Sequence, residues 1–412
     1  MERSELELTL PAGSWESLSA ALQTGCDAVY FGLGNLNMRS QSSVNFTFDD
    51  LPEIVEKCRA RSVKTCLTLN TVIYDEDMDA MCECLRIARR HGVDAVIASD
   101  MATVLRARQE GMEVHASTQL NIGNSEAVRF FAQYCDVMVL ARELSLKQVA
   151  AINDFISRNR ITGPSGKLLK TEMFCHGALC MSVSGKCYLS LHEYNRSANR
   201  GSCVQVCRRS YTAIDNETGR RLEVDSPNIF SPKDLCTVGF LDQLAAAGVR
   251  VFKVEGRARG PEYVKTVGEC YHEALKACCE GCYTEEAIRQ WQNRLQTVFH
   301  RGFWDGYYLG KSVGELTDAS GSKATRKKEY VAVCNNYFSK IGVGEFRMQS
   351  GRLATGDRIL LIGQTTGVVE MEVPVIRVDL QPATQAVKGE VFSMPVPVLV
   401  RRGDKVYLWK DV

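Results

Sequence analysis

Long hydrophobic runs are absent from this chain. No stretch reaches the roughly 18 apolar residues that a membrane-spanning helix needs. The N-terminal segment MERSELELTLPAG also lacks the apolar core of a secretory signal peptide. We therefore expect no membrane association and a cytoplasmic location. In that reducing compartment cysteines stay as free thiols or metal ligands and rarely form disulfides.

An excess of charge of one sign is also absent. The 412 residues contain 50 Lys and Arg against 49 Asp and Glu, which leaves a net charge of +1. This balance excludes a protein that coats nucleic acid non-specifically, but it permits local basic clusters. Two such clusters are candidates for RNA contact, with ordinary solvated surface as the alternative. They are Arg200, Arg208 and Arg209, and Lys323, Arg326, Lys327 and Lys328.

Signature motifs of hydrolases and of regular metal modules are missing too. No H-E-x-x-H motif occurs, because His192-Glu193 and His272-Glu273 lack the second histidine. No serine lies in a G-x-S-x-G motif. Between residues 180 and 236, no pair of cysteines has the C-x2-C spacing of a zinc ribbon or a ferredoxin. Any metal site in this segment must therefore be irregular.

Cysteine, in contrast, is abundant, with 17 in the chain. Thiolates grouped in a reducing compartment usually hold a metal or an iron–sulfur cluster, and thiolates alone do not distinguish zinc from iron. The alternative is a set of buried reduced cysteines, since a free cysteine packs like a small apolar residue. Five of the cysteines fall in one segment: Cys180, Cys187, Cys203, Cys207 and Cys236.

Eight short apolar runs alternate with amphipathic helical stretches up to about residue 260. Alternating β and α elements imply a parallel sheet, and eight repeats predict an α/β fold of the (β/α)8 TIM-barrel type. The predicted strands are Leu6–Leu10, Ala28–Gly32, Lys64–Leu69, Ala95–Ser99, Glu113–Ser117, Val137–Leu140, Thr171–Phe174 and Arg250–Val254.

Polar side chains recur near the C-terminal ends of these strands, where barrels of this type carry their active sites. Loops also begin there, so ordinary loop polarity is the alternative explanation. The residues are Asn70, Asp100, His115, Gln119, Arg142, Glu143, Glu172, His176, Lys253, Glu255 and Arg257.

The predicted barrel domain, residues 1–316, contains one long cysteine-bearing insertion at 175–248. Such long insertions in compact domains are usually functional. Inside it, Ser231-Pro232 predicts the start of a helix that runs to Gly248. Residues 317–329 are rich in Ser, Gly, Thr and Lys and predict a linker. Short alternating strands with Gly-Asp turns then predict a small C-terminal β-barrel at 330–412.

One stretch matches a specific sequence pattern and not only a composition. TEMFCHGALCMSVSGKCYLS, which begins at Thr171, fits the pattern E-x-F-x-H-G-A-x-C followed by S-G-x-C-x-x-S. Further matching elements are N-R-G-x-C-x-x-x-C-R around Cys203, S-P-K-D-L-C ending at Cys236 and K-V-E-G-R starting at Lys253. With these motifs, the chain closely resembles the collagenase-like peptidase family (peptidase family U-thirty-two) over roughly residues 5–310.

This resemblance implies a function that the family name does not convey. Members include oxygen-independent hydroxylases that carry a 4Fe-4S cluster, and some of them act on RNA. The resemblance thus implies an iron–sulfur-dependent RNA hydroxylase, whose expected reaction is hydroxylation of a tRNA wobble uridine with prephenate as the hydroxyl donor. The expected partner is tRNA or rRNA, with a protein partner or a homo-oligomer also possible. By position, the cluster ligands would be Cys180, Cys187, Cys203 and Cys236, with Cys207 as an alternative ligand.

Two other functions stay open. The first is a collagenase-like peptidase, for which Cys180 and His176 are a conceivable nucleophile and base. The second is a non-catalytic RNA-binding factor in which the metal is structural. An aromatic run could stack on bases, although such runs more often pack in the core. It comprises Phe303, Trp304, Tyr307 and Tyr308.

Five residues are candidate catalytic groups in the hydroxylase. His176 is the expected proton-transfer group, since histidine titrates near neutral pH, and Glu172 would orient it. Lys253, Glu255 and Arg257 would lie across the barrel mouth, where an arginine could clamp the carboxylates of the donor. The alternatives are a structural histidine and an ordinary ion-pair network.

Overall fold

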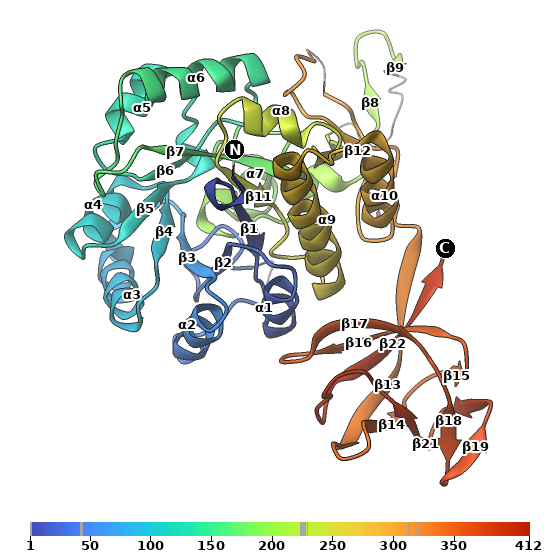
Figure 1. Cartoon of the computed structure of the whole chain (residues 1–412). Helices are drawn as coiled ribbons and strands as arrows, with labels where there is room; N and C mark the ends of the chain where they lie inside the picture. Colours follow the sequence, from blue (N-terminus) through green and yellow to red (C-terminus); the bar gives the residue numbers. More distant parts are fainter. Residues whose placement is uncertain (1, 42–43, 223–227, 229, 312–313, 320) are drawn as a thin grey trace.

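A closed barrel of eight parallel strands forms the larger part of the molecule (Figure 1). The computed structural model describes residues 2–41, 44–222, 228, 230–311, 314–319 and 321–412. The barrel order is β1-β2-β3-β4-β5-β6-β7-β11, and pairing of β11 with both β7 and β1 closes the ring. The (β/α)8 prediction is therefore confirmed. The strands are β1 (Glu7–Pro11), β2 (Ala28–Gly32), β3 (Lys64–Leu69), β4 (Ala95–Ala98), β5 (Glu113–Ala116), β6 (Val137–Val139), β7 (Lys170–Gly177) and β11 (Val251–Val254).

Helices surround this barrel, and several begin at polar caps. Side chains of Ser14, Asp100, Asn124 and Ser145 each accept a backbone N–H bond from the first turn of the following helix. The helices are α1 (Trp15–Leu22), α2 (Leu51–Arg59), α3 (Met78–His91), α4 (Met101–Gln109), α5 (Ser125–Phe131), α6 (Leu146–Arg158), α8 (Leu241–Ala246), α9 (Pro261–Glu280) and α10 (Glu285–Gln296).

A buried ion pair crosses the barrel interior where the ring closes. Lys253 Nζ of β11 lies 2.7 Å from Glu172 Oε1 of β7, and the two side chains are only 5% and 1% exposed. The lysine also lies over the ring of Tyr30 of β2, 4.6 Å from its centroid. The other carboxylate oxygen lies 3.9 Å from His115 Nδ1 of β5. Because these side chains come from four strands, their packing couples opposite sides of the barrel.

Strand β7 extends beyond its neighbour β6, and the insertion covers the overhang. Strand β10 (Asp234–Cys236) pairs antiparallel with the end of β7, placing Cys236 opposite His176. A further short strand, β12 (Phe303–Trp304), runs parallel to β10. The predicted helix over 231–248 is therefore wrong for its first half, and only α8 is helical there. Without a partner, the end of β7 beyond β6 would leave backbone N–H and C=O groups unpaired. Residues Asp234–Cys236 pair with these groups, so they form a strand and not the expected helix.

The insertion closes over the mouth of the barrel. It contains α7 (Leu189–Tyr194), two 3-10 turns, η4 (Ala198–Arg200) and η5 (Val206–Arg208), and a hairpin of β8 (Ala213–Ile214) and β9 (Arg221–Leu222). Backbone bonds join it to two barrel loops, from Val72 N to Asn199 O (3.1 Å) and from Gln41 N to Gly201 O (3.3 Å). Gly201 has φ +82°, and a Cβ there would lie 2.1 Å from Ser40 Oγ. Only glycine permits this close approach.

The C-terminal part is an antiparallel β domain with its own apolar core. It begins at Arg326, inside the stretch predicted as a linker. Its main sheet has the order β17-β16-β22-β13-β14-β21-β18-β19. The strands are β13 (Arg326–Phe338), β14 (Val343–Met348), β15 (Arg352–Ala354), β16 (Arg358–Gly363), β17 (Gly367–Glu372), β18 (Ile376–Val378), β19 (Gln381–Ala383), β20 (Gln385–Val387), β21 (Val391–Pro395) and β22 (Lys405–Asp411).

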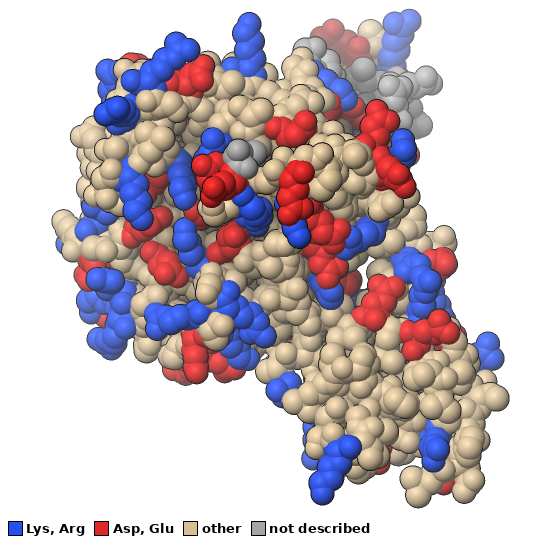
Figure 2. Space-filling view, viewed as in Figure 1, with Lys and Arg blue, Asp and Glu red and all other residues tan. Residues whose placement is uncertain are grey.

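This domain packs against α1 and α9 of the barrel (Figure 1). Gln23 at the end of α1 donates to Thr366 O (2.9 Å) and accepts from Val368 N (3.1 Å). Leu360 and Ile362 of β16 join the apolar core of the barrel. The face seen in Figure 2 carries basic and acidic side chains intermingled, without a large patch of one sign. Among the described residues, no helix is long and apolar enough to cross a membrane.

The barrel-closing ion pair leads to a stability prediction. Glu172→Gln leaves Lys253 buried without its counter-charge, so we expect the free energy of unfolding to fall by about 3–5 kcal/mol. The double variant Glu172→Leu with Lys253→Met removes both charges and should recover most of this loss. Chemical denaturation followed by circular dichroism measures both.

An exposed ion pair provides the matched control. Lys276 and Glu280 on α9 are 58% and 54% exposed, with 3.8 Å between Nζ and Oε1. Glu280→Gln should change stability by less than about 0.5 kcal/mol. If Glu172→Gln unfolded at the same denaturant concentration as the unmodified protein, the buried pair would have no such role.

Candidate active site

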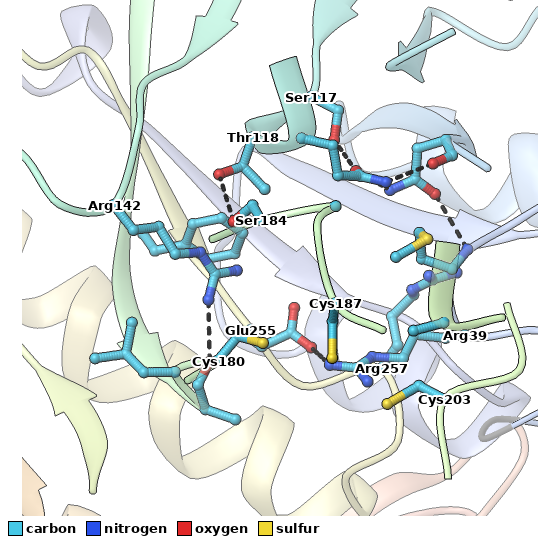
Figure 3. Close-up of a pocket in the computed structure, with 18 of the residues that line it drawn as sticks. Arg39, Ser117, Thr118, Arg142, Cys180, Ser184, Cys187, Cys203, Glu255 and Arg257 are labelled. Carbon is cyan, nitrogen blue, oxygen red and sulfur yellow. Dashed lines mark hydrogen bonds and ion pairs between the residues drawn. The ribbon is translucent and has the colours of Figure 1, made fainter. Parts of the chain in front are cut away.

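A pocket of about 240 Å³ opens at the C-terminal ends of the barrel strands, where the sequence predicted the active site (Figure 3). Tyr30 of β2, Thr68 of β3 and Lys253 of β11 line it from the barrel. The insertion lines it from the opposite side, with residues between Ala178 and Arg208. The two walls enclose the space that a ligand would occupy.

Thiols from four places in the insertion meet at this pocket. Burial raises the pKa of the Cys187 thiol, and the neighbouring thiols of Cys180 and Cys203 raise it further. The pKa of Cys207 is raised in the same way, against the opposing effect of Arg208. The four thiols are therefore within electrostatic reach of one another. They are Cys180, Cys187, Cys203 and Cys207.

Cys236, the fourth ligand expected from the sequence, lies elsewhere. Its place in β10 turns it toward α9, where its sulfur lies 3.9 Å from the Tyr271 hydroxyl. Burial raises the pKa of this thiol to about 11. It is absent from the described lining of the pocket, which Cys207 joins instead.

The donors at the pocket are of the number and type that a 4Fe-4S cluster takes. Within the described ranges, no three His, Cys, Asp or Glu side chains are arranged to hold one metal ion. The four thiols instead surround a shared cavity. A 4Fe-4S cluster takes four thiolates, each on a different iron, so its ligands lie farther apart than those of a tetrahedral zinc ion. The number and chemistry of these donors match that requirement.

Positive charge is concentrated around the pocket. Seven cationic side chains line it, and Glu255 is the one carboxylate among its described lining residues. Glu172 and Asp234 lie behind it, so seven cations face three carboxylates. The remaining excess would offset the negative charge of bound thiolates or of an anionic ligand. The cations are Arg39, Arg142, Arg208, Arg257, Arg259, Arg301 and Lys253.

Glu255 stands at the centre of this charge. Burial acts to raise the pKa of its carboxyl, but Arg39, Arg142 and Arg257 outweigh it and hold the pKa at about 2. Arg39 Nη2 lies 2.8 Å from Glu255 Oε1 (Figure 3). Arg257 is 5% exposed and donates to Asn37 Oδ1 and Thr68 Oγ1, each at 2.9 Å. Glu255 is therefore a fixed anion and not a proton donor at neutral pH.

Three further arginines, Arg142, Arg259 and Arg301, also line the pocket. Arg142 lies 3.8 Å from the centroid of the Phe174 ring, and its buried Nε has no hydrogen-bond partner. Arg259 and Arg301 share Asp234, with nitrogen–oxygen distances of 3.8 and 3.5 Å. Arginine donors held in this way can bind the carboxylate or phosphate of a ligand.

A network of neutral polar groups forms another wall. Asn70 Nδ2 donates to Gln119 Oε1 (3.0 Å), and Gln119 Nε2 donates back to Asn70 O (2.6 Å). The hydroxyl of Ser117 also donates to the Gln119 amide (Figure 3). Gly185 of the insertion packs on Gln119, since a Cβ there would lie 2.9 Å from Gln119 Cβ. Amides fixed in this way can hydrogen-bond the edge of a nucleobase.

His176 lies outside the pocket lining. It is 1% exposed and packs against Tyr263, Tyr271 and Phe303, with ring-centroid distances of 5.4–5.9 Å. Burial lowers its pKa to about 3, so the ring is neutral at physiological pH. Glu172 pairs with Lys253 and does not orient this histidine as expected. None of the described residues that line the pocket is a histidine.

Three residues predicted to contact RNA make contacts inside the protein instead. Trp304 and Tyr308 are 6% and 3% exposed, so stacking of bases on these two side chains is wrong; they pack in the core. Arg208 donates to Ser231 Oγ (2.9 Å) and Pro232 O (2.8 Å).

Arg259 and Arg301 were not predicted as site residues. Arg259 follows Arg257 at the end of a strand, so its position could have indicated it. Arg301 follows α10 and no strand, and only the tertiary fold brings it to the pocket.

The neutral state of His176 makes stability depend on pH. An unfolded histidine gains a proton below its usual pKa of about 6.5, whereas folded His176 stays neutral to about pH 3. Stability is therefore lost as the pH falls through this window, by ~2 kcal/mol between about pH 6.5 and pH 5. We expect His176→Phe to lose ~2 kcal/mol less over that interval, as measured by chemical denaturation at each pH. Parallel pH profiles for the two proteins would contradict this account.

Comparison with known proteins identifies relatives over the whole chain. A protein named "Collagenase" from Porphyromonas gingivalis is 54% identical over 407 residues, covering 99% of this chain and 98% of that protein. "tRNA hydroxylation protein P1" of Bacillus subtilis is 30% identical over 311 residues, 74% of this chain and 71% of that protein. A synthase of 5-hydroxycytidine in 23S rRNA from Escherichia coli is 31% identical over 381 residues, 83% of this chain and 56% of that protein.

The profile of Peptidase family U32 matches residues 13–318, which contain seven of the eight barrel strands, the insertion and all four pocket thiols. With this match and a 54% identical relative over nearly its full length, the chain belongs to Peptidase family U32.

Proposed function

We propose that this protein is an iron–sulfur-dependent, oxygen-independent RNA hydroxylase. The observation that carries the proposal is the meeting of four thiols with an excess of cationic side chains at one pocket. Relatives at 30% and 31% identity are named for hydroxylation of tRNA and of rRNA. Within this class, we propose hydroxylation of a tRNA wobble uridine, with prephenate as the hydroxyl donor.

Cys180, Cys187, Cys203 and Cys207 would hold the 4Fe-4S cluster, because these four line the pocket. When bound, such a cluster supplies one-electron redox chemistry. Its thiolates are negative, and the Arg208 guanidinium opposes the burial that raises the pKa of the Cys207 thiol.

The remaining residues would bind and orient the reactants. Arg142 lines the pocket and is our candidate for binding a carboxylate of the donor. Asn70 and Gln119 would hydrogen-bond the base edge. Lys253 lines the pocket and is held by its ion pair with Glu172, so its Nζ–H groups could hydrogen-bond a developing oxyanion. Glu255 would keep Arg39 and Arg257 in place.

A collagenase-like peptidase is the second candidate, because the relative at 54% identity is named "Collagenase". A cysteine nucleophile needs a base within hydrogen-bond reach. Cys180 is exposed at the pocket, but His176 is buried behind it against Tyr271, with Nδ1 3.3 Å from the Tyr271 hydroxyl. This geometry favours the hydroxylase.

Metal content and RNA analysis test the proposed function together. Anaerobically purified protein should contain about four irons and four sulfides per chain. RNA from a deletion strain should lack one hydroxylated pyrimidine, which the intact gene restores. The proposal would be overturned in favour of the peptidase by three results together: the protein contains no iron, it cleaves collagen, and the nucleosides of the deletion strain are unchanged.

Two cysteine variants test the ligand assignment. Cys207→Ser should lose most of the iron, because this thiol lines the pocket. Cys236→Ser should keep it, because that thiol contacts Tyr271 on the side of α9. Iron and sulfide analysis after anaerobic purification measures both. The reverse result would make Cys236 the fourth ligand, as expected from the sequence.

A further inference from the structure

The insertion segment that lines the pocket is strongly basic. Residues 178–211 contain five Lys and Arg and one acidic residue, Glu193, a net charge of +4 in a chain whose total is +1. Two of the arginines serve the fold: Arg200 bonds Asp77, and Arg208 donates to Pro232 O. The other three residues point to the exposed surface: Lys186, Arg196 and Arg209.

The same segment also exposes two tyrosines. Tyr188 is 72% exposed, the largest exposure of any aromatic side chain in the described part of the chain. It is the N-cap residue of α7 and directly follows Cys187, which lines the pocket. At the other end of α7, Tyr194 is 45% exposed and lies under the Arg209 guanidinium, 5.2 Å from centroid to Cζ.

The acidic residue of the segment is neutralised. Glu193 Oε2 lies 3.8 Å from an Arg209 nitrogen, so the surface retains its positive sign. Exposed tyrosines set among cations beside a pocket are the elements of a site for unpaired nucleotides, since bases stack on the rings and phosphates pair with the cations.

We propose that the α7 face, defined as Lys186, Tyr188, Tyr194, Arg196 and Arg209, binds the single-stranded nucleotides that flank the one entering the pocket. This inference rests on the proposed function and adds the surface that recognises the RNA. A flanking base stacks on Tyr188, and the adjoining phosphates contact Lys186 and Arg196. The substrate class is therefore an RNA loop, because a base-paired strand offers no free base face.

Met181, Val183 and Leu189 are also exposed beside this face, and a protein partner could use them. The net charge favours RNA, which carries a negative charge at every nucleotide. A second copy of this chain fits less well, since like-charged faces repel.

Binding of RNA by the full-length protein tests the α7 face. Fluorescence anisotropy with bulk tRNA, and with an anticodon stem-loop oligonucleotide, should show Tyr188→Ala weakening affinity about tenfold or more. Tyr188→Phe should bind like the unmodified protein, because it keeps the ring. Arg196→Glu should also weaken binding and reduce the slope of log affinity against log salt by about 0.7 or more.

Matched controls come from side chains remote from the pocket. Phe130→Ala removes an aromatic ring of 51% exposure on α5, and Lys340→Glu reverses an exposed charge in the C-terminal domain. Both should bind RNA normally. Circular dichroism and thermal midpoints of all variants should match those of the unmodified protein, because the changed side chains are exposed.

The outcomes separate this inference from the proposed function. If the unmodified protein binds and hydroxylates RNA while Tyr188→Ala and Arg196→Glu bind equally well, the α7 face is not the RNA surface and the proposed function stands. If the unmodified protein binds neither bulk tRNA nor the stem-loop, the inference and the proposed function both fail. If Tyr188→Ala alters the sedimentation of the protein and leaves RNA affinity unchanged, the face is a protein interface and the inference is overturned.

Discussion

The positive charge held around one pocket is the constraint on which the rest of this structure depends. Buried guanidinium groups are costly unless they are paired or meet an anion. The barrel provides Glu255 and Glu172 for this purpose, and the insertion provides Asp234. The pairs they form join strands and loops that lie far apart in the sequence. The four thiols and an anionic ligand would complete this balance. The insertion therefore contributes charged groups and thiols to the pocket as well as covering it.

Much of the fold could be predicted because it follows from local patterns. The apolar runs that predicted eight strands coincide with them to within a few residues, for example at Lys64–Leu69 of β3. Strand-end polarity correctly indicated the mouth of the barrel, and Lys253, Glu255 and Arg257 line the pocket there. These successes rest on the rule that parallel strands present their C-terminal ends at one face.

The differences between the predicted and the observed positions come from contacts that no local pattern encodes. His176 follows the register of a strand longer than its neighbour, so it enters an aromatic cluster behind the pocket. Cys236 lies in a strand that pairs with that overhang, where a proline-initiated helix was expected. No sequence pattern indicated Tyr188, because an exposed aromatic residue cannot be distinguished from a buried one without knowledge of the fold.

The most direct test of the account is the position of iron. Crystals grown anaerobically from the iron-loaded protein would be measured with X-rays at the iron absorption edge. The account predicts one anomalous peak in the pocket, bonded to Cys180, Cys187, Cys203 and Cys207 and adjoining the Arg39–Glu255 pair. A peak bonded to Cys236, a zinc signal in place of iron, or a pocket without a metal peak would contradict it.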